Sequence, residues 1–162
     1  MTLFLKNLLF VLVAPGSLGG WLPWWLVRRW GLTAPVPWGP LQWCAVPLLV
    51  LGAVILLAGV WEFAVRGRAT PAPIDAPQVL VVSGLFRYVR NPMYVGITLV
   101  NAGWALLFAS RGMALYGVCV FAGFNAFVLL YEEPTLIAKF GDAYHRYRAV
   151  VGRWLPGRPF SG

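Results

Sequence analysis

Four long apolar segments make up most of the chain, and polar residues gather at their ends. The segments are Leu3–Val27, Leu41–Val65, Met93–Ser110 and Met113–Tyr131. Each is long enough, or nearly so, to cross a hydrocarbon core of about 30 Å as an α-helix. The pattern therefore predicts an all-α membrane protein with about four transmembrane helices.

The first apolar segment is the least regular of the four. Helix-breaking residues interrupt it at Pro15, Gly16, Gly19, Gly20 and Pro23. Such residues are tolerated at membrane depth only where protein or a cavity satisfies the freed backbone groups. We expect this segment to be kinked or broken in two. It lacks a basic leader and a small-residue cleavage site, and we expect it to be retained rather than removed as a signal peptide.

The third and fourth segments are joined by a very short link around Arg111-Gly112. A short link makes consecutive helices antiparallel neighbours, so their other two ends should lie side by side. One of these ends carries "FRYVRNPMYVG", residues 86–96, and the other carries "LLYEEPTL", residues 129–136. The sequence thus predicts that two arginines and two glutamates meet at one end of a helical hairpin.

A second type of helix is predicted after Pro134, in "TLIAKFGDAYHRYRAVV". Its apolar residues recur at spacings of three and four, while most charged residues lie elsewhere around the helix. This is typical of a C-terminal amphipathic helix on the membrane surface. Residues 66–92, with Pro71, Pro73 and Pro77 in their first half, are expected to form an extended or interfacial connector. The apolar positions of the predicted C-terminal helix are Leu136, Phe140, Tyr144, Tyr147 and Val151.

Composition and charge support a membrane location. Hydrophobic residues make up 60% of the 162 residues, charged residues make up 11%, and the mean hydropathy is +0.73. The formal net charge is +8, but the basic residues are dispersed at the ends of apolar segments, which argues against nucleic acid as a partner. If the spans alternate and the N-terminus is cytoplasmic, only three basic residues, Arg28, Arg29 and Arg111, lie on the outer side of the membrane. We expect one membrane domain, residues 1–162, in a bacterial or archaeal inner membrane, with both termini cytoplasmic.

Asn91-Pro92 marks the start of a helix, because proline disfavours helical geometry in the preceding residue and suits the first helical position. The free N–H groups of this helix end, with Arg87, Arg90 and Tyr94 nearby, would make an anion site. The alternative is that the arginines anchor the span to anionic headgroups and that Tyr94 belongs to an interfacial aromatic belt.

Glu132 and Glu133 are two adjacent carboxylates in a chain with only 5 acidic residues. A structural hypothesis is that one of them caps the following helix, or that either pairs with an arginine, Arg87, Arg90 or Arg148. A functional hypothesis is that a carboxylate here accepts hydrogen bonds from a ribose diol. The residues alone leave both open.

Other polar residues have structural interpretations. Glu62 and Arg66 have the spacing of a helical ion pair. Asn101 and Asn125 could hydrogen-bond across the hairpin or contact a substrate headgroup. His145, Cys44 and Cys119 form no cluster, so we expect no metal site and no disulfide.

The stretches "GLFRYVRNPMYVG" and "YEEPTLIAKFGDAYHRYRAVVGRWLP", between Gly84 and Pro156, resemble integral-membrane methyltransferases. The relatives are isoprenylcysteine carboxyl methyltransferase and phospholipid N-methyltransferase. Their shared pattern joins an Arg-x-x-Arg-His-Pro-x-Tyr-x-Gly turn, a helical hairpin, Glu-Glu and a tyrosine-bearing helix. On this resemblance, residues 84–158 would form the cofactor-binding part, and residues 1–83 the N-terminal spans and connector.

The resemblance implies S-adenosylmethionine as the cofactor. It implies a catalytic role for Arg90, Asn91, Tyr94 and Glu133. Asn91 replaces the histidine of well-studied members and cannot titrate near neutral pH, which argues against a base at this position. The implied cofactor-binding residues are Arg87, Arg90, Asn91, Pro92, Tyr94 and Gly96, the pair Glu132 and Glu133, and Tyr144, Tyr147 and Arg148 in a C-terminal lid.

The expected function is S-adenosylmethionine-dependent methyl transfer to a lipid-like acceptor at the membrane interface. Acceptors of this kind include an isoprenylcysteine-type carboxylate and a phospholipid amine. Two alternatives remain at this point. One is an NADPH-dependent membrane reductase of the sterol reductase type, although adjacent glutamates suit a 2′-phosphate badly. The other is a non-enzymatic membrane scaffold.

Overall fold

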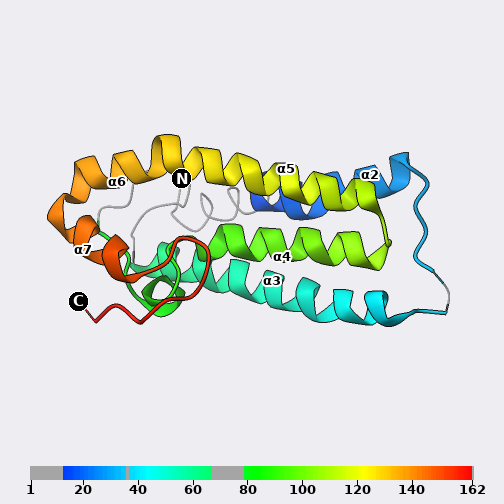
Figure 1. Ribbon diagram of the computed structural model, residues 1–162, viewed down its shortest axis with the longest axis horizontal. Coiled ribbons are helices and arrows are strands. Elements are labelled where there is room, and N and C mark those ends of the chain that lie inside the picture. Colours follow the sequence, from blue (N-terminus) through cyan, green and yellow to red (C-terminus); the bar gives the residue numbers. More distant parts are fainter. Residues whose placement is uncertain (1–12, 36, 67–78, 162) are drawn as a thin grey trace.

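Three long helices lie side by side and form the body of the molecule (Figure 1). They are α3 (Pro40–Arg66), α4 (Pro92–Leu107) and α5 (Arg111–Phe127), and α4 lies between the other two. The computed structural model describes residues 13–35, 37–66 and 79–161. The beginning of the predicted span Leu3–Val27 and part of the predicted connector therefore lie outside the described residues.

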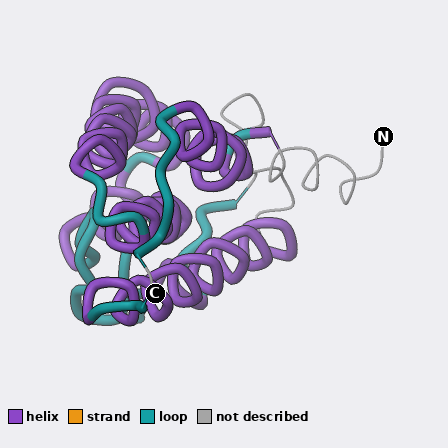
Figure 2. The backbone as a smooth tube through the Cα atoms, turned by 90° about the vertical axis from the view of Figure 1, so that its right-hand side faces the viewer, coloured by secondary structure: helices purple, strands orange, loops and turns teal. Residues whose placement is uncertain are grey.

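Shorter helical elements complete the described chain, in which no strand is found (Figure 2). The α6–α7 region and the C-terminal segment gather at one end of the long helices, whereas α2 lies toward the other (Figure 1). The elements are the π-helix η1 (Ser17–Trp21), α2 (Leu22–Arg29), the 3-10 helix η2 (Gly84–Arg87), the π-helix η3 (Val128–Glu132), α6 (Glu133–Phe140) and α7 (Asp142–Val150).

Glycines hold α3 and α4 in close contact. A Cβ added to Gly96 would lie 2.7 Å from the carbonyl oxygen of Gly52, and one added to Gly52 would lie 2.7 Å from the carbonyl oxygen of Gly96. No side chain other than hydrogen fits between backbones at this distance. Small residues at such crossings are typical of membrane helix pairs.

The outer surface of the bundle is strongly apolar, as expected of a surface that faces lipid. Trp61 on α3 is 70% exposed, and Leu115 and Val118 on α5 are also exposed. Two helices, over Pro40–Glu62 and Arg111–Phe140, are long and apolar enough to cross a membrane, and α4 is a shorter apolar helix. The all-helical fold is confirmed, but the described residues do not establish four spans.

The irregular first segment is π-helical at Ser17–Trp21, where the sequence predicts a kink or a break. Neighbouring helices provide donors for its carbonyl groups. Trp104 Nε1 of α4 donates a hydrogen bond to the Gly19 oxygen at 2.9 Å, and Tyr116 Oη of α5 donates to the Leu18 oxygen at 2.7 Å. Protein groups thus satisfy an irregular helix at this depth.

The fourth apolar segment does not end at Tyr131 as predicted. Helix α5 continues through η3 into α6, so that helical structure runs without a break from Arg111 to Phe140. A π-turn holds one more residue than an α-turn, which rotates every later side chain by about 100° relative to an uninterrupted α-helix. The turn at Val128–Glu132 therefore sets the direction in which Glu133 points.

The predicted C-terminal amphipathic helix is two helices rather than one. Gly141 separates α6 from α7 with a φ of +49°, a conformation that residues with a Cβ rarely adopt. The chain turns at this glycine, and α7 packs Tyr144 and Tyr147 into a small apolar core with Val151. This turn brings the residues after α7 back to the N-terminal end of α4.

Candidate active site

The two ends of the helical hairpin meet, as the short link predicts. Arg90, just before α4, donates a hydrogen bond through Nη1 to Glu133 Oε1, the first residue of α6, at 2.7 Å. The two side chains are 11% and 10% exposed. A nearly buried, charge-assisted contact of this length fixes the two helix ends relative to each other.

Arg153 is the second partner of Glu133, and the sequence analysis assigned it no role in the site. Its Nε donates to Oε1 at 2.8 Å and its Nη2 donates to Oε2 at 3.0 Å. The arrangement is bidentate, the strongest geometry for an arginine and a carboxylate. It raises the pKa of the Arg153 guanidinium, mainly through the hydrogen bond to Glu133. Two cations therefore share one anion.

The C-terminal segment carries Arg153 into this position by pairing with the chain before α4. Val89 and Gly152 form a parallel bridge, and the Arg90 N–H donates to the Gly152 oxygen at 2.9 Å. Further along, the Gly157 N–H donates to the Tyr88 oxygen at 2.8 Å. A short backbone pairing of this kind leaves no apolar pattern in the sequence. The segment "VVGRWLP" therefore contains no pattern that predicts the position of Arg153.

The second glutamate has a different environment. Tyr94 Oη donates a hydrogen bond to Glu132 Oε2 at 3.0 Å, and the Tyr94 ring stacks on Phe124 with ring centroids 4.6 Å apart. Trp154 lies near the same ring at 6.5 Å and donates through Nε1 to Asn125 Oδ1 at 3.2 Å. An aromatic wall therefore stands beside Glu132.

Tyr144 contacts the ion cluster formed by Arg90, Glu133 and Arg153, whereas the Tyr147 hydroxyl bonds to the backbone. Arg90 Nη1 donates to Tyr144 Oη at 3.4 Å, and burial raises the pKa of this phenol. Tyr147 Oη donates to the Phe86 carbonyl oxygen at 2.6 Å. Burial raises the pKa of Tyr147 as well. The hydroxyl of Tyr147 is thus occupied by backbone, and its place in a cofactor lid stays a prediction.

Asn91 is buried and links the two segments rather than capping α4. Its Nδ2 donates to the Arg153 carbonyl oxygen at 3.3 Å, and it makes no side-chain hydrogen bond to the helix that it precedes. Pro92 is the first residue of α4, as predicted. The amide of Asn91 therefore helps to hold the backbone that positions the guanidinium of Arg153.

Three other predicted residues lie at the edge of the cluster or outside it. Arg87 is exposed and donates through Nε to the Phe160 oxygen at 3.1 Å. Arg148 is exposed, and its charge acts on Glu133 from a distance. Gly96 faces α3, where it packs against Gly52, so its predicted place in a cofactor wall is not supported.

Several structural hypotheses from the sequence are corrected. Glu132 precedes α6 without a capping hydrogen bond from its side chain. Asn101 and Asn125 do not bond to each other, because Asn125 pairs with Trp154 and the amide of Asn101 has no partner. Glu62 accepts a hydrogen bond from Ser83 Oγ at 2.9 Å, and its pairing with Arg66 stays a prediction.

The cluster has both a hydrogen-bond donor and hydrogen-bond acceptor positions that are not used. Arg90 Nε is buried and has no hydrogen-bond partner. Glu132 accepts a described hydrogen bond only at Oε2, from Tyr94, whereas Glu133 is occupied by two arginines. An ionised carboxylate offers about four acceptor positions. The site can therefore bind a ligand that carries both an anionic group and hydroxyl or ammonium donors.

Comparison with known proteins identifies the family. A profile of phospholipid methyltransferases matches residues 41–143, which is more than half of the chain. The chain belongs to the phospholipid methyltransferase family. Two apolar helices of spanning length together with this family indicate a membrane protein.

Individual relatives match the chain in part. The protein-S-isoprenylcysteine O-methyltransferase of Schizosaccharomyces pombe is 33% identical over 78 residues, 48% of this chain and 33% of the relative. The methanethiol S-methyltransferase of Mycobacterium tuberculosis is 36% identical over 72 residues, 44% of this chain and 28% of the relative. An uncharacterized Haemophilus influenzae protein is 39% identical over 64 residues, 39% of this chain and 100% of its own length.

The matched part of the chain thus spans about a third of the length of the two relatives with named activities. No solved structure gives a significant match. The family is consequently established by sequence, and the arrangement of the candidate site rests on the geometry described above.

Proposed function

We propose that the protein transfers a methyl group from S-adenosylmethionine to a lipophilic or amphiphilic acceptor at the membrane surface. The observation that carries this proposal is the Arg90–Glu133–Arg153 cluster with Glu132 and Tyr94 beside it. It places charged groups at the end of an apolar helical bundle. A water-soluble cofactor and a lipid-borne acceptor can meet at such a boundary.

The residues of the cluster fit the groups of this cofactor. Its amino-acid carboxylate would be held by Arg90, whose buried Nε lacks a partner, with the exposed Arg148 nearby. Its ribose diol would donate to Glu132, which retains free acceptor positions. The faces of Tyr94 and Tyr144 are suited to its sulfonium, an interaction worth about 0.5–2 kcal/mol.

The protein has mainly to align the reactants and exclude water. When bound, S-adenosylmethionine would supply an electrophilic methyl group for in-line attack by the acceptor on the methyl carbon, with S-adenosylhomocysteine as the leaving group, and this chemistry requires no catalytic triad. Glu133, Arg90 and Arg153 hold the helix ends at a fixed distance, and Tyr94 orients Glu132. Such pre-organisation can supply a large part of the rate enhancement.

The family resemblance leaves the acceptor open between a carboxylate, an amine and a thiol. The two named relatives are a protein-S-isoprenylcysteine O-methyltransferase and a methanethiol S-methyltransferase. We propose a lipid-like acceptor because the outer faces of α3 and α5 are apolar and exposed. The distribution of basic residues supports a location in the inner membrane with both termini and the cluster on the cytoplasmic side.

Calorimetric titration of the purified protein in detergent tests the proposal. S-adenosylhomocysteine, the demethylated cofactor, should bind with a single site, and NADPH should not bind. Two adjacent glutamates oppose a 2′-phosphate, which arginine normally accommodates. Binding of NADPH alone would favour the reductase alternative, and binding of neither would favour a scaffold.

A further inference from the structure

Asn125 is a half-buried polar residue on α5, a helix whose exposed side chains are mainly apolar. Its Oδ1 accepts a hydrogen bond at 3.2 Å from Nε1 of Trp154, in the segment after α7. Polar side chains on membrane-spanning helices are costly, so they usually pair with another protein group. Apolar packing alone does not require this pair, because leucine and phenylalanine would fill similar space without polar atoms.

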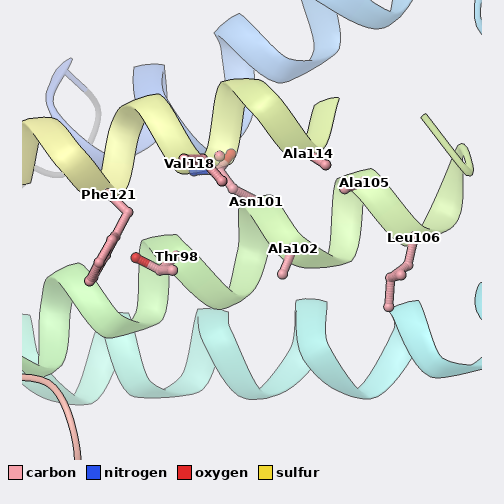
Figure 3. A pocket seen from close by; sticks show the side chains of 9 residues that line it. Thr98, Asn101, Ala102, Ala105, Leu106, Ala114, Val118 and Phe121 are labelled. Atoms are coloured by element: carbon pink, nitrogen blue, oxygen red, sulfur yellow. The ribbon is translucent and has the colours of Figure 1, made fainter. Parts of the chain in front are cut away.

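The Trp154 indole connects α5 with the aromatic wall beside Glu132. Its ring contacts Phe121 of α5 edge-on, with centroids 5.1 Å apart, and its centroid lies 6.5 Å from that of Tyr94 on α4. Figure 3 shows the Phe121 side chain extending from α5 toward α4, along the groove between the two helices. Hydrogen bonds are directional, so the bond from Nε1 to Asn125 selects one orientation of the indole between its aromatic neighbours.

The residue before Trp154 is Arg153, whose guanidinium binds Glu133. The C-terminal segment is thus attached at two points, Asn125 and Glu133, to the helical run that continues from α5 into α6. These points lie about 12 Å apart along the run, at about 1.5 Å per residue. The π-turn Val128–Glu132 lies between them. The two attachments therefore bridge the turn that sets the direction of Glu133.

We propose that Asn125 is a positioning residue of the cofactor site and that it acts through Trp154. The oriented indole keeps Arg153 in register with Glu133 and remains beside Tyr94. The inference rests on the proposed function, because it assigns a further residue to the same site. A fully satisfied polar pair in apolar surroundings adds little net stability, but it specifies one arrangement of the groups that it joins.

The test compares a single variant with a double variant. Asn125→Leu leaves the Trp154 N–H without its acceptor, so it should lower both the unfolding temperature and the affinity for S-adenosylhomocysteine. Asn125→Leu combined with Trp154→Phe removes both polar groups and should regain most of the stability. Its affinity should nevertheless stay about fivefold below that of the original protein, the factor that corresponds to one hydrogen bond. Recovery of affinity together with stability would overturn the positioning role.

Trp104→Phe is the matched control for these variants. Trp104 Nε1 donates to the Gly19 oxygen at 2.9 Å, so the change removes a comparable indole hydrogen bond near the C-terminal end of α4, opposite the ion cluster. It should lower the unfolding temperature without changing the affinity for S-adenosylhomocysteine measured by calorimetry. A loss of affinity equal to that of Asn125→Leu would show that any weakened bundle loses the ligand, and would overturn the proposal.

Nuclear magnetic resonance follows the guanidinium of Arg153 directly. Protein prepared with isotope-labelled arginine gives Nε–H signals, and the Arg153 signal is identified by its loss in Arg153→Lys. In Asn125→Leu this signal should shift toward that of a free arginine, because the bond from Nε to Glu133 Oε1 is loosened. The signal of Arg87, whose Nε donates to the Phe160 oxygen, should not change. An unchanged Arg153 signal would contradict the inference.

Titration with S-adenosylhomocysteine separates this inference from the proposed function. If the ligand binds the original protein and Asn125→Leu with equal affinity, the positioning role is wrong and the proposed function stands. If the ligand binds neither protein, the proposed function fails, and the role of Asn125 in cofactor binding fails with it.

Discussion

Arg153 donates two hydrogen bonds to Glu133, at 2.8 and 3.0 Å, and so joins the segment after α7 to the first residue of α6. Glu133 also accepts from Arg90, and its carboxylate is therefore the common anion of two cations from distant parts of the chain. The contact makes the C-terminal segment part of the candidate site rather than a tail beside it. Its removal should affect both stability and ligand binding.

Arg153→Gln should weaken binding of S-adenosylhomocysteine and lower the free energy of unfolding by about 1.5–3 kcal/mol, the usual contribution of hydrogen bonds to a charged group. The physical reason is that Glu133 loses its bidentate partner while Arg90 remains. Calorimetry and denaturant unfolding in detergent measure the two effects. Arg158→Gln is the matched control, since it removes a nearby exposed arginine without a described ion pair. Equal effects of both variants would mean that only net charge matters.

Glu133→Gln should destabilise the protein more than Arg153→Gln does, because it leaves two guanidinium groups without their anion. Removing one partner of a buried ion pair costs about 3–5 kcal/mol, and the partial exposure of Arg153 places the expected value near the lower limit. The double variant Glu133→Gln, Arg153→Gln should be more stable than the sum of the single effects predicts. A double-mutant cycle measures this coupling, and strict additivity would contradict the shared-anion arrangement.

Tyr94→Phe should weaken S-adenosylhomocysteine binding, because Glu132 loses the hydroxyl that orients it. Tyr116→Phe removes a comparable hydroxyl hydrogen bond, to the Leu18 oxygen, in another part of the bundle. Both variants should lose about 1 kcal/mol of stability. Only Tyr94→Phe should lower the affinity measured by calorimetry, and unchanged affinity would exclude Glu132 from the site.

Gly96→Ala should destabilise the helix pair by about 1–3 kcal/mol, because its Cβ would meet the backbone of α3 at 2.7 Å. Gly123→Ala offers the opposite case, since nothing lies within 4 Å of its Cβ and alanine favours the helix by about 1 kcal/mol. Thermal unfolding of both variants in the same detergent compares them. A neutral Gly96→Ala variant would show that the α3–α4 contact is not close in solution.

The stability of the protein should fall as the pH rises above about 10. Burial raises the pKa of Tyr144, so folding favours its protonated form. The resulting stability is complete below the pKa of an unfolded tyrosine, about 10, and is lost as the pH rises through the folded pKa. The free energy of unfolding between pH 9 and 11 should therefore decrease less steeply in Tyr144→Phe than in the original protein. Identical slopes would show that this phenol is not buried.

The sequence predicted that the arginines of residues 86–96 and the two adjacent glutamates would meet, because a very short link leaves an antiparallel hairpin almost no freedom. A turn between Leu107 and Arg111 forces the opposite helix ends together. Arg153 was missed for a contrasting reason. Its position depends on the Gly141 turn and on a single backbone bridge between Val89 and Gly152, and neither produces periodicity in the sequence.

The helices, too, were predicted only in part from the sequence. Apolar content alone located α3, α4 and α5, because burial in lipid requires apolar side chains all around a helix. It could not locate the π-turn at Val128–Glu132, which depends on packing and carries no compositional pattern. The sequence therefore predicts a separate helix after Pro134, whereas the helical structure passes through Pro134 without a break.

The bridge between Val89 and Gly152 also bears on biosynthesis. All the long helices precede Gly152 in the chain, so the bridge can form only after the residues that follow α7 have left the ribosome. The carboxylate of Glu133 then has only Arg90 until Arg153 is delivered. A nascent chain should accordingly complete the candidate site only after the helices that carry Arg90 and Glu133 have been made.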